Sequence, residues 1–468
     1  MSTIHTLYIS IVVLLSVVIV PFDARHDARA AETNRSEWLD SLVVSAGTIL
    51  SAHDQQPFWL QSNQHARFGR EGNLFYTRLR FSKHGDDEKK FDWSYGVDVT
   101  KRSGSNSDVA WTDAYAGLRY KNFKLTVGRK SEFFGLADSL LTAGPEFYSS
   151  RAPNIPKIVL STNGFVNIAD DFAINAYLAH GVMGEEQYVK NAYLHQKFLY
   201  LRYGTPNPYE GINIYAGLHH VVIWGGTERV TGFRYPSGLN DFAKVFFGKA
   251  GGSNASANDQ AYALGNHLGS IEYAIQVKGD ERDWFLYAQT LFEDSSGLVG
   301  AGFIKPGDYL VGLSLINKEP GATIKRINLE YLDTTGESMN SDGSGSYFNH
   351  YEYASGWTYE GYGIGHPFIS SIPGPNNRWY AQNWLQGANA GMALEFSDLF
   401  NPVIRIAWIR QKGIMYNPRP AEDTFAFTIA NSSRLGKNWT FEQAFFFDAG
   451  KAMEPNAAML FSISRSFF

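Results

Sequence analysis

The sequence predicts an all-β protein, a transmembrane antiparallel β-barrel of about 18 strands (16–18) with a small N-terminal helical element and long external loops. Three observations predict this fold. Apolar and polar residues alternate over runs long enough to cross a bilayer, about 9–11 residues. Aromatic residues make up 15% of the chain and charged residues only 19%, whereas soluble domains are nearer a quarter charged. The last run, from Ala457 to Phe468, alternates to its end, as a strand that closes a sheet would.

Residues 1–30 are expected to be a secretory signal peptide. Leu7 to Pro21 is continuously apolar but shorter than the ~20 residues that a spanning helix needs, and Ala28-Arg29-Ala30 fits a cleavage site. The alternative is an uncleaved anchor, because Met1 to Thr6 contains no Lys or Arg. Both alternatives export the chain, and a barrel predicts the outer membrane as its destination.

Residues 31–70 are expected to form a periplasmic, helical segment that leads into a barrel spanning residues 71–468. Within this segment Trp38, Leu42 and Ile49 recur at mixed spacing, and Ser36 is placed to cap a short helix. The sequence therefore predicts a helix at the entrance of the barrel.

Beyond this segment the dominant period is two. From Phe91 to Thr100 every apolar side chain falls on one face and every polar or small one on the other. Weaker candidates lie near Ile158 and Phe198. The same pattern predicts strands at Phe75 to Phe81, Ala114 to Tyr120, Phe123 to Lys130, Phe172 to Ala179, Ile212 to Val222, Ile271 to Lys278, Trp284 to Phe292, Tyr309 to Asn317, Ile324 to Tyr331, Ala388 to Phe396, Val403 to Arg410, Thr424 to Ala430 and Trp439 to Phe447.

A soluble β-sandwich also alternates, but its strands are usually only 5 to 6 residues long. Several runs here are longer, and aromatic residues lie at run ends, where membrane interfaces place them. The connections are also of two kinds. Some are tight, and others are long, namely Ser131 to Lys157, Gly181 to Lys197, Ile223 to Ser270 and Leu332 to Gly387. This asymmetry is typical of barrels with short periplasmic turns and long external loops.

Several function classes find no support in the sequence. The net charge is −5 without a basic run, which argues against nucleic acid, and cysteine is absent. Adjacent strand residues such as His219-His220 point to opposite faces and chelate one ion poorly. Acidic pairs such as Glu185-Glu186 suit solvated turns better than the two separated carboxylates of a glycosidase. We therefore expect no enzyme, no cofactor and no metal site.

Two loop segments favour ligand binding. Tyr347 to Pro367 combines aromatic residues with Gly, Asn and His, and Asn376 to Tyr380 follows closely. Aromatic faces stack on sugar C–H surfaces while Asn and Arg donate directed hydrogen bonds, so the mixture suits a saccharide. The same composition could instead fold a loop over the barrel mouth. The candidate contact residues are Trp357, Tyr359, Asn376, Asn377, Arg378 and Trp379.

Six strings together resemble one family. They are Pro57 to Gln64, Val127 to Lys130, Leu140 to Ile158, Ala263 to Ser270, Phe292 to Gly297 and Ser355 to Gly361. In this order they resemble the Wzi family of capsule-assembly outer-membrane proteins. The resemblance implies an 18-stranded barrel with a small helical element near the periplasmic end. It also implies a lectin-like role in which capsular polysaccharide is held at the cell surface.

In this interpretation Arg129, Arg151, Glu293 and Asp294 are candidate groups of the lumen or loops. The alternative, a structural ion-pair network that braces the barrel interior, is the stronger expectation. The predicted function is non-covalent binding of capsular polysaccharide or exopolysaccharide by a monomeric barrel in contact with outer-membrane lipids. A diffusion porin and, less so, a surface hydrolase of the phospholipase or glycosidase kind remain alternatives.

The terminal run carries one irregularity. Met459, Phe461, Ile463 and Phe467 share a face with Arg465, whereas Phe468 falls on the other face. Either a bulge near Arg465 shifts the register, or Arg465 extends to the lipid headgroups and Phe468 turns inward.

Overall fold

The computed structural model describes residues 38–86, 88–205, 207, 209–293, 308–336, 346–397, 399–451 and 453–467. The expected signal peptide, Asp294 and Phe468 lie outside the described residues. Within these ranges, no helix has both the length and the apolar character that a transmembrane helix needs.

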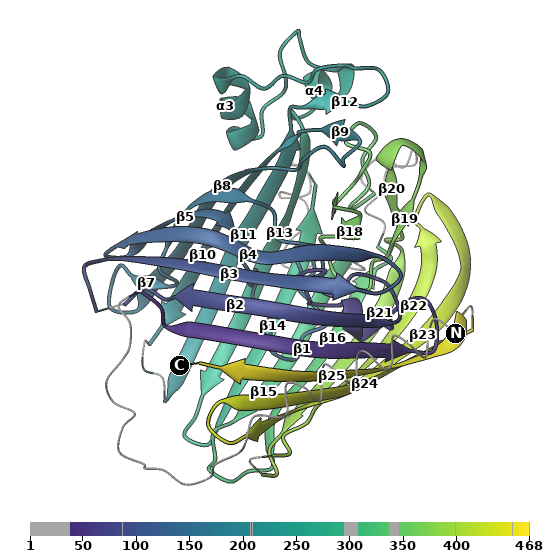
Figure 1. Cartoon of the computed structure of the whole chain (residues 1–468). Coiled ribbons are helices and arrows are strands. Elements are labelled where there is room, and N and C mark those ends of the chain that lie inside the picture. Colours follow the sequence, from purple (N-terminus) through teal and green to yellow (C-terminus); the bar gives the residue numbers. More distant parts are fainter. Residues whose placement is uncertain are drawn as a thin grey trace.

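Eighteen antiparallel strands close into a barrel, as predicted (Figure 1). Closure is direct, because β1 (Ser41–Ser51) pairs with β2 (Leu74–Lys83) on one side and with the last strand, β25 (Met453–Ser466), on the other. The other strands of the barrel wall are β3 (Phe91–Ser103), β4 (Ser107–Tyr120), β5 (Phe123–Arg129), β6 (Lys157–Thr162), β8 (Phe172–Val182), β10 (Tyr193–Gly204), β11 (Gly211–Trp224), β13 (Asn266–Lys278), β14 (Arg282–Phe292), β15 (Asp308–Asn317), β16 (Ile324–Thr334), β21 (Leu385–Leu394), β22 (Val403–Ile414), β23 (Asn417–Leu435) and β24 (Trp439–Gly450). The weaker candidates near Ile158 and Phe198 are β6 and β10.

In the described ranges, seven further strands, each of two or three residues, lie beside or above the barrel wall. A two-residue strand, β7 (Val166–Asn167), extends the sheet beside β8, and three small two-stranded sheets lie in the long loops. One joins two different loops, by pairing β9 (Val189–Lys190) with β12 (Thr227–Glu228). The other two are hairpins, formed by β17 (Thr358–Tyr359) with β18 (Tyr362–Gly363) and by β19 (Ser371–Pro373) with β20 (Trp379–Ala381).

The expectation of a helical segment over residues 31–70 is wrong for residues 41–51, which form the barrel strand β1. The barrel therefore starts at Ser41 and not at residue 71. Because several side chains of β1 are small, the alternation of apolar and polar residues is weak in this segment. A small residue is required at Gly47, because a Cβ at this position would lie 2.6 Å from the Tyr76 ring. Helix α2 (Phe58–Gln61) does lie in the range, but in the β1–β2 connection, where Trp59 Nε1 donates to the carbonyl of Ala426, whose side chain is fully buried.

The outer wall is apolar. Exposed residues of different wall strands, such as Leu125, Ile214, Leu286 and Leu329, alternate with less exposed ones, which is the pattern of a lipid-facing belt. Exposed aromatic residues gather at the end of the barrel with the tight turns; they are Trp38, Phe91, Tyr120, Phe123, Tyr203 and Trp284. They form a girdle of the kind that marks a membrane interface.

The last strand excludes the first alternative for the terminal run, a bulge near Arg465. Its register with β1 and β24 is continuous from Met459 through Arg465, so no bulge lies near Arg465. The Arg465 guanidinium lies 5.4 Å from the Trp439 ring centroid and 4.9 Å from that of Phe467. Arg465 thus lies on the lipid-facing side of the strand, between aromatic rings at the girdle. This position agrees with the second alternative, in which Arg465 extends to the lipid headgroups.

Long connections meet at one end of the barrel, and two of them fill the lumen. They follow β1, β5, β8, β11 and β16, whereas the connections at the other end are short. The β5–β6 connection, residues 130–156, packs inside the wall, where Glu330 of β16 accepts hydrogen bonds from Thr142 Oγ1 (2.5 Å) and the Ala143 amide (2.8 Å). Phe147 of this connection stacks on Trp357 of the β16–β21 connection, with centroids 5.2 Å apart. We call residues 130–156 the plug.

Candidate functional site

Two long loops form a surface that combines arginine, asparagine and aromatic side chains. Arg70 comes from the β1–β2 connection, and Tyr362, Asn376, Arg378 and Trp379 come from the β16–β21 connection. The Arg70 guanidinium lies 4.2 Å from the Tyr362 ring centroid and 5.6 Å from that of Trp379, and its Nη2 donates to the Gly361 carbonyl (2.5 Å). All five side chains are exposed or half-buried. We call these five residues the arginine platform.

The β19–β20 hairpin presents the second half of the platform. Its turn holds Asn376 and Asn377 at φ angles of 58° and 60°, a left-handed conformation that Asn tolerates better than most residues. Asn377 Nδ2 donates to the Glu186 carbonyl (3.0 Å), and Gly361 lies against the Trp379 ring, where a Cβ would come within 2.8 Å. The hairpin is therefore fixed by its own turn and by a neighbouring loop.

Arg378 is anchored by a buried tyrosine. Its guanidinium lies 4.3 Å from the Tyr188 ring centroid, and Nη2 donates to the Tyr188 hydroxyl (2.8 Å). That hydroxyl in turn donates to Glu228 of β12. A planar guanidinium that is held in this way keeps its remaining N–H groups in a fixed direction.

Two of the six predicted contact residues are misplaced by the sequence argument. Trp357 and Tyr359 are only 2% and 4% exposed, so they cannot contact a ligand at the surface. Trp357 Nε1 donates to the Phe147 carbonyl (2.7 Å), and it supports the loop above the plug. These two side chains therefore lie inside the folded loop, whereas Asn376, Asn377, Arg378 and Trp379 lie at the surface.

The predicted lumen groups have separate partners. Arg129 Nη2 lies 3.4 Å from the Tyr359 hydroxyl and 3.5 Å from Glu360 Oε1. Arg151 donates to the carbonyl of Pro367 (3.1 Å), and burial lowers its pKa to about 10. Glu293 directly follows β14, and Asp294 lies outside the described residues. Both arginines therefore contact the β16–β21 connection.

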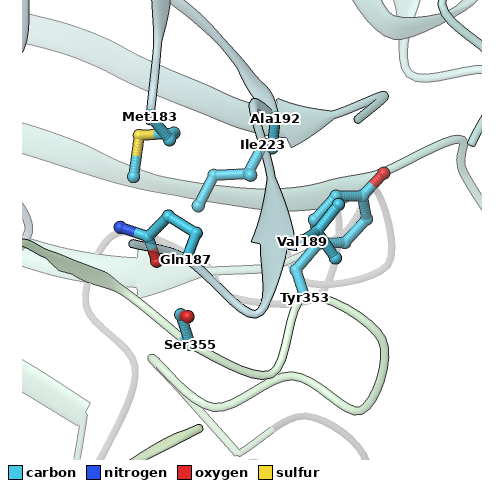
Figure 2. Close-up of a pocket in the computed structure, with 8 residues that line it drawn as sticks. Met183, Gln187, Val189, Ala192, Ile223, Tyr353 and Ser355 are labelled. Carbon is cyan, nitrogen blue, oxygen red and sulfur yellow. The ribbon is translucent and has the colours of Figure 1, made fainter. Parts of the chain in front are cut away.

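A small pocket adjoins the platform. It has a cavity volume of only about 10 Å³ and is lined mainly by apolar residues, as Figure 2 shows for Met183, Val189 and Ile223. Ser355 at its lower side accepts from the Tyr188 amide and donates to the Asn377 carbonyl, each over 2.7 Å. Binding cavities for small molecules are usually larger, about 300–1,000 Å³. The pocket thus fits a positioning role beneath the platform better than it fits a sugar.

The adjacent histidines lie on opposite faces of β11, as predicted. His219 faces the lumen, where Nε2 lies 2.9 Å from Gln196 Nε2, whereas His220 faces outward, 3.1 Å from His267 Nδ1. In the described part of the chain, no group of three or more His, Asp or Glu side chains is arranged to hold a metal ion.

The β16–β21 connection should respond to pH through His366. Burial and the nearby Arg151 lower the pKa of His366 from 6.5 to about 3. The folded loop therefore favours the neutral imidazole ring. The contribution of this ring to the stability of the loop is complete above pH 6.5 and decreases, by at most ~1.4 kcal/mol per pH unit, as the pH falls toward 3. Hydrogen exchange of residues 363–370, corrected for the intrinsic rate, should rise more in the wild type than in His366→Gln on acidification. An equal rise in the wild type and in His366→Gln would contradict this expectation. His84→Gln, at an exposed histidine, serves as the control and should respond as the wild type does.

Sequence reasoning missed Arg70, Tyr188 and Tyr362 as members or supports of the site. Tyr362 lies within the aromatic segment that the sequence singled out, but nothing local distinguishes it from the buried Tyr359. Arg70 and Tyr188 come from other loops, and only the closed barrel brings them together.

A closed, 18-stranded barrel with an apolar belt, tight turns at one end and long loops at the other defines an outer-membrane β-barrel protein. A profile of the family described as "Capsule assembly protein Wzi" matches residues 43–374. The chain belongs to this family.

The fold is similar to that of several solved structures. Wzi from Escherichia coli, described as an outer-membrane protein of group 1 capsule assembly and a carbohydrate-binding β-barrel, matches with a TM-score of 0.58 at 14% identity, over 90% of this chain and 83% of that one. OpdK from Pseudomonas aeruginosa with vanillate matches with a TM-score of 0.45 at 8% identity, over 91% of this chain and 97% of that one. OpdL from the same organism matches with a TM-score of 0.45 at 11% identity, over 91% and 98%. No curated protein matches the chain.

Proposed function

We propose that the protein binds capsular polysaccharide or exopolysaccharide non-covalently at the arginine platform and helps to retain it at the cell surface. The observation that carries the proposal is the exposed Arg70 guanidinium over the rings of the half-buried Tyr362 and Trp379, with Arg378 next to Trp379 in the chain, at the long-loop end. Membership of a capsule-assembly family and the likeness to a carbohydrate-binding barrel support it.

The chemistry of the platform suits a repeating saccharide. Guanidinium and amide groups donate to hydroxyl or carboxylate oxygens, and the edges of Tyr362 and Trp379 offer apolar contact to sugar C–H groups. Each contact is weak, but a polymer presents the same group many times, so that rebinding raises the overall avidity. A monomeric barrel embedded in outer-membrane lipid is sufficient for this role, and the role requires no catalytic step.

The filled lumen argues against the alternative of a diffusion porin. Besides the hydrogen bonds that Glu330 accepts from the plug, Gln289 of β14 accepts from the Glu146 amide (2.7 Å), and Asn389 of β21 donates to the Leu141 carbonyl (3.0 Å). Side chains of three wall strands thus hold the plug across the lumen, where a porin keeps a water-filled channel.

Replacing both platform arginines should weaken polysaccharide binding. In Arg70→Ala/Arg378→Ala, the loss of two charge-assisted donors, each contributing roughly 1.5 kcal/mol, is expected to reduce the affinity of the purified barrel for the polysaccharide of its own cell surface at least about tenfold. Binding is measured by the retention of fluorescently labelled polysaccharide on proteoliposomes.

Arg419→Ala is the matched control, because Arg419 is an exposed arginine on β23 near the same end. It should bind as the wild type does. Equal affinity of the double variant and the control would place the binding surface elsewhere and overturn the assignment to the platform. A wild-type barrel that retains no polysaccharide would overturn the proposed function itself.

A further inference from the structure

The β11–β13 connection contains an amphipathic helix that packs on the outside of the barrel. Helix α3 (Leu239–Phe247) and the shorter α4 (Ala257–Ala261) lie together at the long-loop end (Figure 1). The buried side of α3 packs against the wall through Phe242 and Val245, which form a cluster with Val222 and Trp224 of β11.

The wall beneath α3 is polar where a barrel is normally apolar. Lys197 shares the outward face with Leu199 two residues further along β10, and it pairs in register with Leu178 and His220. His180 and His195 lie in the next outward row. Polar side chains at lipid-facing positions are costly.

Helix α3 covers this polar patch. The His195 ring centroid lies 5.2 Å from that of Phe242 and 5.4 Å from that of Phe246. Lys197 Nζ lies 4.1 Å from the Phe246 ring centroid and donates to the Phe246 carbonyl at the end of the helix. The helix therefore shields the polar positions of β8 and β10 from the surroundings of the barrel.

The side of α3 that faces away from the wall carries an exposed apolar stripe, which Asn240 and Lys244 flank. Leu239, Ala243 and Phe247 recur every four residues, so they share one face, and Leu239 and Phe247 are 89% and 70% exposed. The patch lies at the height of the lipid-facing belt, because His180 pairs in register with Ile158 of β6, an outward residue that is 59% exposed. The exposed face of α3 thus continues the belt around the barrel at its outer rim.

We propose that α3 is an interfacial helix whose Leu239–Ala243–Phe247 face contacts the lipid of the outer leaflet. Continuity with the belt supplies the apolar contact. Lys249, with its ammonium 5.9 Å from the Phe247 ring centroid, supplies a cation at the level where lipid headgroups carry phosphate. Lipid contact at this rim would also orient the loops above it with respect to the membrane surface.

Single cysteines test this contact, because the chain has no cysteine of its own. A nitroxide label is placed on Phe247→Cys in the full-length protein, reconstituted in vesicles that contain lipopolysaccharide. Collision rates with oxygen, which partitions into lipid, and with a water-soluble nickel chelate are then compared. Ile158→Cys is the lipid-facing reference and Tyr351→Cys, at a site that is 87% exposed, is the reference for the external loops.

The proposal predicts an oxygen-to-nickel ratio at position 247 close to that at 158 and several-fold above that at 351. A ratio equal to that at 351 would mean that α3 faces water. Low collision rates with both reagents would mean that a protein surface covers it. Either result overturns the proposal. Circular dichroism of each variant confirms that the barrel is folded, and Leu239→Cys repeats the test at the other end of the same helix face.

Discussion

The Glu272→Ala/Glu330→Ala variant is expected to conduct ions in steady steps in planar bilayers, whereas the unaltered protein should not. Glu330 accepts from Thr142 and Ala143 of the plug, and Glu272 of β13 accepts from the Leu136 amide (2.5 Å). The double substitution leaves these three buried donors without their acceptors, at a cost of about 1–3 kcal/mol each. The plug should then leave the lumen, and an emptied barrel of 18 strands is wide enough for an aqueous channel.

Exposed glutamates at the long-loop end provide the control. Glu422→Ala/Glu454→Ala removes the same number of carboxylates, but from the surface, and it should remain closed. Steady conductance of the unaltered protein would contradict the closed lumen and favour a porin. A closed double variant would show that Gln289 and Asn389 suffice to hold the plug.

Trp357→Ala should have the second large effect, the loosening of the β16–β21 connection without loss of the barrel. The indole is buried, stacks on Phe147 with an interplanar angle of 2° and donates to its carbonyl. Truncation of a buried tryptophan typically costs about 3–5 kcal/mol. Limited proteolysis should therefore cleave residues 346–384 much faster, and polysaccharide binding should fall, because the platform lies on this connection.

Trp357→Phe separates the two interactions, since it keeps the stacking and loses the hydrogen bond; we expect an intermediate cleavage rate. Tyr351→Ala, on the same connection but exposed, should be cleaved at the wild-type rate. If Trp357→Ala resists protease as the wild type does while it loses binding, Trp357 would be a contact residue after all, and its interpretation as a support would be wrong.

The barrel could be predicted from the sequence because lipid imposes a period of two on every strand. Phe91 to Thr100 is a clear example, and β3 covers the whole of that run. The exception is β1, where Ser45, Ala46 and Gly47 are too small to show an apolar face. The local pattern of Trp38, Leu42 and Ile49 therefore resembled a helix, although pairing with β2 and β25 determines the structure.

The candidate site was less predictable, because burial in a loop depends on what covers it. Trp357 and Trp379 lie in similar aromatic surroundings in the sequence, yet Phe147 of the plug covers the first, whereas Arg70 lies over the second. The sequence gives no signal that residues 70 and 379 meet. The polar outward positions of β8 and β10, in contrast, were visible as histidines and a lysine in otherwise apolar runs, and they indicate where a loop must fold over the wall.

The central claim is that the platform retains polysaccharide at the cell surface. Its most direct test is the ratio of cell-bound to released polysaccharide in a strain from which the gene is deleted. The strain is complemented with the wild type, with Arg70→Ala/Arg378→Ala or with Arg419→Ala, each at equal outer-membrane abundance. We predict that deletion shifts polysaccharide to the medium, that the wild type and Arg419→Ala restore retention, and that the platform variant does not. Unchanged retention after deletion, or full restoration by the platform variant, would contradict the account.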